Sequence, residues 1–172
     1  RQMCRRNGDW DGTHHQLTGA HIDRTVQEQL PILVGGNGDT LLRQAARHAN
    51  IIGLQGLGKT LEDGHRHTMK WTIEHLDHQV DFIRVEASGR DIELNALVQV
   101  VVITDDAQTA EDNLLKRVDG LTRDALRALP YILIGTVDEI VAKLHACRDR
   151  WGISYFVVRK LDDFVPVIAA CR

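Results

Sequence analysis

The sequence is poor in several residue types, and each shortage excludes a class of protein. Only three of its 172 residues are cysteines, and they lie far apart without any C-x-x-C pair. This spacing provides no disulfide framework and favours free thiols in a reducing compartment. Aromatic residues make up 5% of the chain, and the tryptophans are too dispersed to form a stacking platform for nucleic acid.

Long apolar runs and an excess of one charge are also missing. No stretch approaches the roughly 18 consecutive apolar residues that a membrane-spanning helix needs, and the polar N-terminus lacks the apolar core of a signal peptide. The formal net charge is −3, with acidic and basic residues interspersed, so no basic surface for nucleic acid or anionic lipid is predicted. These features predict a cytoplasmic protein with no nucleic-acid and no membrane partner.

Apolar residues, in contrast, make up 43% of the chain, which is enough to bury the core of one domain. Buried strands are predicted from the short apolar runs PILV, NIIGL, ELNALVQVVVIT, YILIG and ISYFVV. Segments with apolar residues at helical spacing separate these runs. Because strands that alternate with helices form βαβ crossovers, the predicted fold class is α/β with a parallel sheet.

Several predicted helices carry start or stop signals. Asp39 or Thr40 is placed to cap the helix of DTLLRQAARHA. Thr136 and Glu139 form the S/T-x-x-E capping box of a helix that Gly152 ends. A further helix, ended by the Ser-Gly pair at 88–89, is predicted from the apolar stripe of Met69, Ile73, Leu76, Val80 and Ile83.

Three more segments complete the predicted organisation. Asp105 and Asp106 open a helix after the longest strand, and LTRDALRAL and LDDFVPVIAAC predict two others. Residues 1–30 are polar and weakly patterned, and the Asp11-Gly12 pair within them predicts a small hairpin. The first 30 residues are therefore a connecting segment, and the domain itself occupies residues 31–172.

A glycine-rich stretch, GLQGLGKT at residues 53–60, fits the P-loop pattern of nucleotide hydrolases. In a P-loop the helix begins at the Gly-Lys-Thr itself, because the amides of that first turn hold phosphate. Here Glu62, Asp63 and Gly64 follow, and the apolar stripe starts only near Met69. A mobile glycine-rich loop after a strand is the preferred interpretation, and the P-loop hydrolase stays as an alternative.

The turn in PILVGGNGDTLL has the context that a phosphate site needs. A predicted strand ends directly in Gly35, Gly36 and Gly38, and a helix begins at once. The unpaired amides and the positive dipole end of such a helix both favour an anion. A plain tight turn between strand and helix is the alternative.

The string PILVGGNGDTLLRQAARHANIIGL resembles a segment of the luciferase-like monooxygenases, in particular their coenzyme F420-dependent oxidoreductase branch. WDGTHHQL, ELNALVQVVVITDD, YILIGTVDEIV and WGISYFVV are similar to further landmarks of that family in the same order. The match runs from about Trp10 to Ile168. It implies a parallel-stranded (β/α)8 TIM-type barrel of which residues 31–172 form the C-terminal half, strands 5 to 8, so that Arg1 is read as the start of a fragment.

The resemblance also implies a function and a site. The family transfers hydride or activates oxygen with a reduced flavin or deazaflavin, held at the C-terminal mouth of the barrel. The resemblance implies that the cofactor is coenzyme F420, with FMN as the alternative, and that the substrate is an unidentified small organic molecule. The residues implied to bind the cofactor are Gly35, Gly36, Asn37, Gly38, Asp39, Thr40, Leu54 and Gln55.

Two departures from the family pattern accompany the resemblance. Asp39 stands where relatives often have a basic residue, and Asn50 replaces an aspartate. The residues that contact the reacting ring are expected in the first four strands, so no catalytic residue is assigned. Because a half barrel exposes strand edges, we expect a homo-oligomer or association with an N-terminal half. A non-catalytic flavin-binding relative is the second alternative.

Nine histidines suggest a metal site only at first sight. His65 with His67, and His75 with His78, provide pairs but not the three or four ligands of defined geometry that zinc requires. No metal site is predicted. Cys147 lies on the apolar stripe of its helix, which predicts a buried, unreactive thiol.

Overall fold

The computed structural model describes residues 7–21, 27, 29–62, 64 and 67–171. The chain divides into two compact units, Arg1–Ile32 and Leu33–Arg172. The first contains an antiparallel hairpin of β1 (Asn7–Asp11) and β2 (Gln16–His21). The amide of Gly12 donates to the carbonyl of His15 at 3.0 Å inside its turn. The hairpin predicted from the Asp-Gly pair is confirmed.

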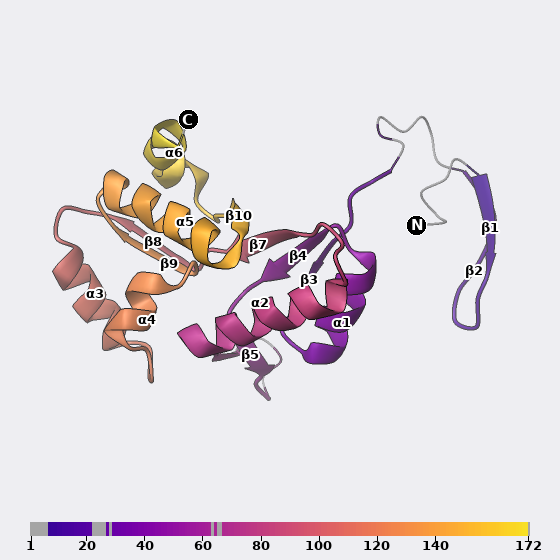
Figure 1. Ribbon diagram of the computed structural model, residues 1–172, viewed down its shortest axis with the longest axis horizontal. Coiled ribbons are helices and arrows are strands. Elements are labelled where there is room, and N and C mark those ends of the chain that lie inside the picture. The colour runs from indigo at the N-terminus through magenta and orange to yellow at the C-terminus, as the bar shows by residue number, and fades with distance from the viewer. Residues whose placement is uncertain (1–6, 22–26, 28, 63, 65–66, 172) are drawn as a thin grey trace. The chain divides into compact units, whose positions relative to one another are not determined.

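The centre of the second unit is a four-stranded parallel sheet of order β10-β7-β4-β3 (Figure 1). Its strands in chain order are β3 (Leu33–Gly35), β4 (Ile51–Leu54), β7 (Glu93–Leu97) and β10 (Ile153–Val157). Each of these four strands lies beside the next one in chain order, and all run the same way. The turns that follow them therefore share one edge of the sheet, the carboxyl edge.

Four of the unit's helices accompany this sheet, and the first two pack together over one of its faces. They are α1 (Asp39–His48), α2 (Ile73–Ala87), α5 (Val137–Trp151) and α6 (Leu161–Ala170). Ile52 and Leu54 of β4, with Leu94 and Ala96 of β7, belong to the same buried core as the apolar residues of α1 and α2. Because side chains alternate along a strand, the residues between them point to the opposite face.

The longest predicted strand is divided in two, which corrects the sequence interpretation. The amide of Val98 donates to Val157 of β10 at 2.9 Å, whereas the amide of Gln99 donates to the carbonyl of Tyr131 at 2.8 Å. β7 consequently stays in the main sheet, while β8 (Val100–Ile103) pairs in parallel with β9 (Ile132–Gly135) in a separate two-stranded sheet. Between β8 and β9 lie α3 (Ala107–Leu115) and α4 (Arg123–Ala128).

Several predicted helix ends are confirmed. Thr136 and Glu139 form both hydrogen bonds of the capping box, and Gly152 ends that helix with φ 76°. Ser88 ends α2 in the left-handed conformation. The side chain of Asp106 caps α3 by accepting from the Thr109 amide at 3.1 Å.

The cap predicted for α1 is wrong. The N-cap residue is Gly38, and no side chain caps the helix. Asp39 and Thr40 lie one and two positions further on, inside the first turn, where their side chains are no longer placed as caps. The carboxylate of Asp39 still complements the positive end of the helix dipole from there.

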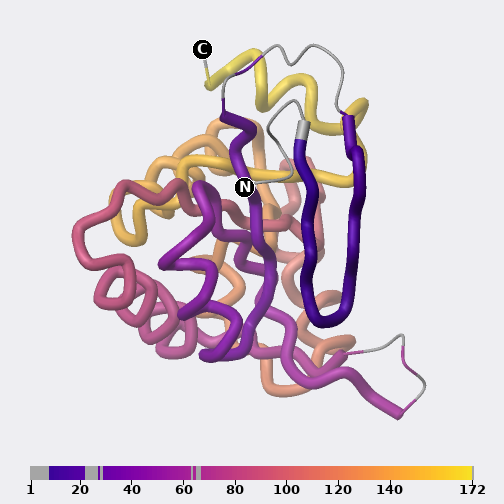
Figure 2. The backbone as a smooth tube through the Cα atoms, turned by 90° about the vertical axis from the view of Figure 1, so that its right-hand side faces the viewer, coloured from indigo at the N-terminus to yellow at the C-terminus, as the bar shows by residue number. Residues whose placement is uncertain are grey.

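The segment after β4 is an antiparallel hairpin of β5 (Leu57–Thr60) and β6 (His67–Met69), not the predicted loop. It extends away from the rest of its unit (Figure 2). Lys59 and Thr60 are thus strand residues and open no helix, so the P-loop interpretation is wrong. Met69 is also misplaced by the sequence interpretation, because it lies in β6, 45% exposed, and α2 begins at Ile73. Asp63 and His65 lie outside the described residues.

The α/β class with a parallel sheet is confirmed, whereas a closed barrel is not seen. β3 and β10 lie at the two ends of the four-stranded sheet and do not meet. Within the part of the chain that the structure describes, no helix has the length and apolar character to cross a membrane.

Candidate functional site

The glycine-rich turn after β3 and the end of β4 lie side by side at the carboxyl edge. The register pairs Gly35 with Gly53, and the amide of Gly36 donates to the Gly53 carbonyl at 3.3 Å. A Cβ atom built on Gly35 would lie 3.2 Å from Nε2 of Gln55, so the Gln55 side chain lies across that glycine. The structure therefore brings the two predicted segments, residues 35–40 and 54–55, together.

The turn leads into α1 with its helix start open. The carbonyl of Gly38 accepts from the Leu42 amide at 2.9 Å, but no side chain caps the first turn. No described atom outside its chain neighbours lies within 4 Å of a Cβ built on Gly38, whereas the side chain of Leu41 packs directly over Gly36. The amides at the start of α1 are free of intrahelical partners, and the side at Gly38 is where an anion can approach them.

One row of paired residues crosses all four strands next to this turn: Gly35, Gly53, Asn95 and Tyr155. Residues in register on parallel strands share a face, and this is the face opposite the core with α1 and α2. A Cβ built on Gly53 would lie 3.3 Å from Oδ1 of Asn95, so the two glycines let the side chains of Gln55 and Asn95 approach the backbone closely. Asn95 is 4% exposed and donates to the Tyr155 carbonyl at 3.0 Å, and the Tyr155 side chain is 39% exposed.

A cluster of polar side chains lies behind the turn, where residues of α2 meet Asn37. Gln79 is 1% exposed, and its Nε2 donates to the Asn37 carbonyl at 3.5 Å. Three of the buried side-chain atoms that find no hydrogen-bond partner among the described residues lie here: Oδ1 of Asn37, Oε1 of Gln79 and Nε2 of His75. Burial lowers the pKa of His75 below 6.5, as do Lys70 and His78, while Asp39 opposes the shift. We call Asn37, His75 and Gln79 the polar cluster.

The sequence interpretation missed the polar cluster, although one signal was present. Gln79 stands next to Val80 in the apolar stripe, three residues after Leu76 and four before Ile83. A polar residue at core-facing spacing has to find a partner or pay the cost of desolvation. His75 was interpreted as part of a solvated face, and its ring nitrogen Nε2 is buried instead.

The loop after β4 is anchored by two buried aromatic rings. Trp71 and Tyr131 stack with ring centroids 6.5 Å apart, and both are less than 5% exposed. Gly56 has φ +63°, and a Cβ there would lie 2.5 Å from Trp71 and 2.6 Å from Tyr131. This close packing fixes the chain directly after Gln55.

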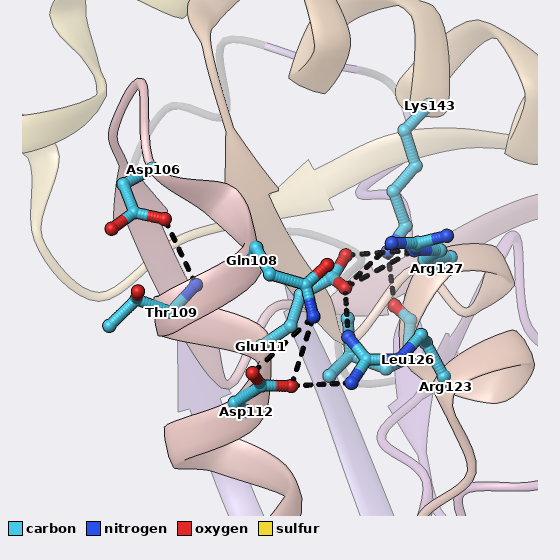
Figure 3. A network of polar contacts seen from close by, with 9 residues as sticks. All are labelled: Asp106, Gln108, Thr109, Glu111, Asp112, Arg123, Leu126, Arg127 and Lys143. Atoms are coloured by element: carbon cyan, nitrogen blue, oxygen red, sulfur yellow. Dashed lines mark hydrogen bonds and ion pairs between the residues drawn. The ribbon is translucent and has the colours of Figure 1, made fainter.

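The charged network at α3, α4 and α5 is mutually paired and offers no free cation to an anionic ligand (Figure 3). The Glu111 carboxylate, 5% exposed, accepts from Arg123 at 2.6 Å and from Arg127 at 2.9 Å. Arg127, then Arg123, holds the pKa of Glu111 below its ordinary 4.5. Lys143 donates to the carbonyls of Leu126 at 2.7 Å and Ile132 at 2.5 Å, and burial lowers its pKa to about 8.

Two further sequence interpretations concern thiols and metals. Cys147 is buried, as predicted, and burial raises its pKa to about 11, which disfavours the thiolate. Over the described ranges, no three His, Cys, Asp or Glu side chains gather in a way that could hold a metal ion.

No protein-family model matches the chain, and no curated protein matches it in sequence. Solved structures do match it. A long-chain alkane monooxygenase matches with TM-score 0.61 and 17% identity, over 94% of this chain and 45% of that protein. The coenzyme F420-dependent tetrahydromethanopterin reductase from Methanopyrus kandleri matches with TM-score 0.63 and 16% identity, over 93% and 55%.

A riboflavin lyase, solved with modified FMN and riboflavin, matches with TM-score 0.61 and 17% identity, over 95% of this chain and 48% of that one. The chain thus spans about half the length of these structures. Identities this low show the fold alone. The sequence resembles a group with monooxygenase and F420-dependent branches. That resemblance is confirmed at the level of the fold.

Proposed function

We propose that this chain is the cofactor-holding half of a flavin- or deazaflavin-dependent oxidoreductase acting on a small organic molecule. In this proposal, the residues that hold the cofactor are Gly35, Gly36, Asn37, Gly38, Asp39, Thr40, Leu54 and Gln55. Coenzyme F420 is the first candidate and FMN the second, because both join a planar ring to a phosphate-bearing chain. When bound, the ring supplies hydride transfer or oxygen activation.

The open start of α1 beside the glycine row carries the proposal. Free amides at residues 39–41 donate to the phosphate, and the helix dipole stabilises its charge. The planar ring lies on the side chains that cover this row, Gln55 over Gly35 and Asn95 over Gly53, with Tyr155 at the far end of the row. Gln55 lies across Gly35 and orients the segment between phosphate and ring.

The chain has half the length of its fold neighbours, so we further propose that it functions as an oligomer or with a second (β/α)4 half. β3 and β10 both have one unpaired edge within the described sheet. Such edges are satisfied by pairing with further strands. Catalytic residues would come from that second half.

The proposal is tested by titrating the chain with F420, FMN and riboflavin, following cofactor fluorescence. F420 or FMN is expected to bind at least 10-fold more tightly than riboflavin, which has no phosphate. Gly38→Asp places a capping carboxylate on the same amides; it should raise the melting temperature while weakening FMN binding more than 10-fold. The control Asn113→Asp adds the same charge to the exposed surface of α3, in its last turn, and should not raise the melting temperature or weaken FMN binding.

Equal binding of FMN and riboflavin, or an unchanged FMN affinity in Gly38→Asp, would overturn the proposal. The second candidate is a non-catalytic flavin-binding protein. Asp39 is the only one of the proposed cofactor-binding residues that carries an ionisable side chain, so these residues supply binding in either case. Oxygen consumption with reduced FMN separates the two, because a purely binding protein would not accelerate it.

A further inference from the structure

The hydrogen bonds of Lys143 suit a neutral amine better than an ammonium group. Its Nζ reaches from α5 toward α4 and donates to the carbonyl of Leu126 at 2.7 Å (Figure 3), and it donates to the carbonyl of Ile132 on β9 at 2.5 Å. Among the described residues these carbonyls are its two partners, and no carboxylate forms an ion pair with it. An ammonium group has three N–H donors, whereas a neutral amine has two. Two carbonyls therefore satisfy the neutral amine and leave its lone pair free.

Lys143 also lines a cavity of about 390 Å³, which lies between α3, α4, β9 and α5. The side chains of Ala107, Leu126 and Ile134 form the apolar part of its wall. A volume of this size holds a small organic molecule. None of the residues that line the cavity belongs to the proposed cofactor site, so what the cavity binds does not depend on the proposed function.

Burial makes the amine of Lys143 nucleophilic near neutral pH. It lowers the pKa from 10.5 to about 8, although Cys147 and Glu111 oppose the shift. Roughly a tenth of this amine is neutral at pH 7, compared with less than about a thousandth of an ordinary lysine. Cys147 lies one helical turn further along α5, and burial raises its pKa to about 11, so it stays a thiol. Lys143 is therefore the available nucleophile here.

The charges around the cavity decide which electrophile suits Lys143. Glu111 and Glu139 line the same cavity, and Glu139 stands one helical turn before Lys143 on α5. The Arg127 guanidinium is already paired with Glu111. An anionic adduct on the amine, such as a carbamate, would face these carboxylates and the two backbone carbonyls. An imine can take up a proton to become an iminium cation, which the same groups stabilise.

We infer that Lys143 captures small aliphatic aldehydes as imines in this cavity. The lone pair of the amine attacks the carbonyl carbon, a C–N bond forms, and a proton moves from nitrogen to oxygen to give a carbinolamine. The hydroxyl group then takes up a proton and leaves as water, and the resulting iminium releases a proton to become the imine. No oxidant or reductant is consumed. The carbon chain of the aldehyde packs on the apolar wall.

The test uses the full chain with propanal and cyanoborohydride, which reduces an imine to a stable secondary amine. Labelled lysines are located by mass spectrometry after digestion, and the exposed Lys116 is the internal control. At pH 7 Lys143 is expected to be labelled at least about 10-fold faster than Lys116. Between pH 6 and pH 9 the labelling of Lys143 should rise and then level off above pH 8.

A substitution in the cavity wall tests whether the cavity is the binding site. Ala107→Leu fills part of the cavity and leaves the amine in place, so the labelling of Lys143 should fall more than about 3-fold while that of Lys116 is unchanged. Ala142→Leu adds the same bulk to the exposed surface of α5 and should alter neither. Should Ala107→Leu fail to fold, the wild type is labelled with propanal and with the bulkier 2,2-dimethylpropanal. Propanal should then be favoured by a larger factor at Lys143 than at Lys116.

Three results would overturn the inference. The first is labelling of Lys143 no faster than that of Lys116, or only after unfolding in urea. The second is an equal fall in Ala107→Leu and Ala142→Leu, and the third is the same selectivity between the two aldehydes at both lysines. None of these results bears on the proposed cofactor site, which the titrations with F420 and FMN test separately.

Discussion

Glu111 on α3 and Arg127 on α4 form a two-point ion pair, in which Nε of Arg127 lies 2.9 Å from Oε1 of Glu111 and Nη2 lies 2.9 Å from Oε2. The pair joins the two helices of the segment between β8 and β9. Because the carboxylate is buried and the guanidinium is largely exposed, the energetic effect of the pair resides mainly with Glu111.

Glu111→Gln is therefore expected to lower the free energy of unfolding at pH 7 by about 2 kcal/mol. The pKa of Glu111 is lowered in the folded chain, so its stabilisation is present above pH 4.5 and is lost as the pH falls through the folded-state pKa. Urea unfolding at pH 7 and at a series of pH values below 4.5 measures both effects. The difference between the two proteins should shrink as the pH falls below 4.5, and the half-exposed control Asp112→Asn should lose less than Glu111→Gln at pH 7.

Lys143 gives a pH dependence of the same sign in the alkaline range, but from burial of a cation and not from an ion pair. Burial lowers its pKa from 10.5 to about 8, with Cys147 and Glu111 opposing the shift. Between these two values the unfolded chain binds more protons than the folded chain, so the contribution of Lys143 to stability rises with pH.

Relative to Lys143→Met, the wild type should gain up to about 3 kcal/mol of unfolding free energy between pH 8 and pH 10. Cys147 titrates in the opposite sense, and Lys143 lowers its pKa, so the difference between the two proteins reports Lys143 together with its coupling to Cys147. Parallel curves over this pH range would contradict the prediction.

Gly56→Ala should destabilise the chain by about 2–4 kcal/mol, because the new methyl group meets Trp71 and Tyr131 and the residue must keep φ +63°. Gly120→Ala is the control. Gly120 also has a positive φ, but no described atom lies within 4 Å of its built Cβ, so only backbone strain of about 1 kcal/mol is expected. Thermal melting of both variants checks the ranking, and equal losses would show that the packing around Gly56 is not decisive.

Asp39→Asn should strengthen phosphate binding about 3-fold at low ionic strength, because a carboxylate in the first turn of α1 competes with the anion for the same dipole. The gain should disappear in 0.5 M salt, where exposed charges are screened. Asp124→Asn makes the same change in the first turn of α4 and is expected to leave phosphate binding unaltered. Calorimetric titration with inorganic phosphate decides the matter.

The parts of the fold that depend on local signals could be predicted from the sequence. The capping box of Thr136 and Glu139 spans four residues, and the strand of PILV is bounded by its own proline and glycines. The position of Met69 could not be predicted in this way. It continues the helical spacing of Ile73, but a hairpin formed through contacts with Leu57 takes it out of the helix.

The site was only partly predictable for a similar reason. The two glycine-containing segments were identified along the chain, but the row from Gly35 to Tyr155 exists only because of strand register. The division between β7 and β8 depends on the Tyr131 carbonyl, more than thirty residues away in sequence. Gln79 was recognisable as a polar residue in an apolar stripe, but its partner at Asn37 depends on how α2 packs beside the turn.

The divergent hydrogen bonds of Val98 and Gln99 have an evolutionary consequence. The chain leaves the main sheet after β7, at Gln99, and returns to it at β10, which is the neighbour of β7. The number of residues between Gln99 and Gly152 therefore does not alter how β7 pairs with β10. Insertions or deletions in the parts of this excursion away from Tyr131, which packs against Gly56, therefore leave both that pairing and the chain after Gln55 in place.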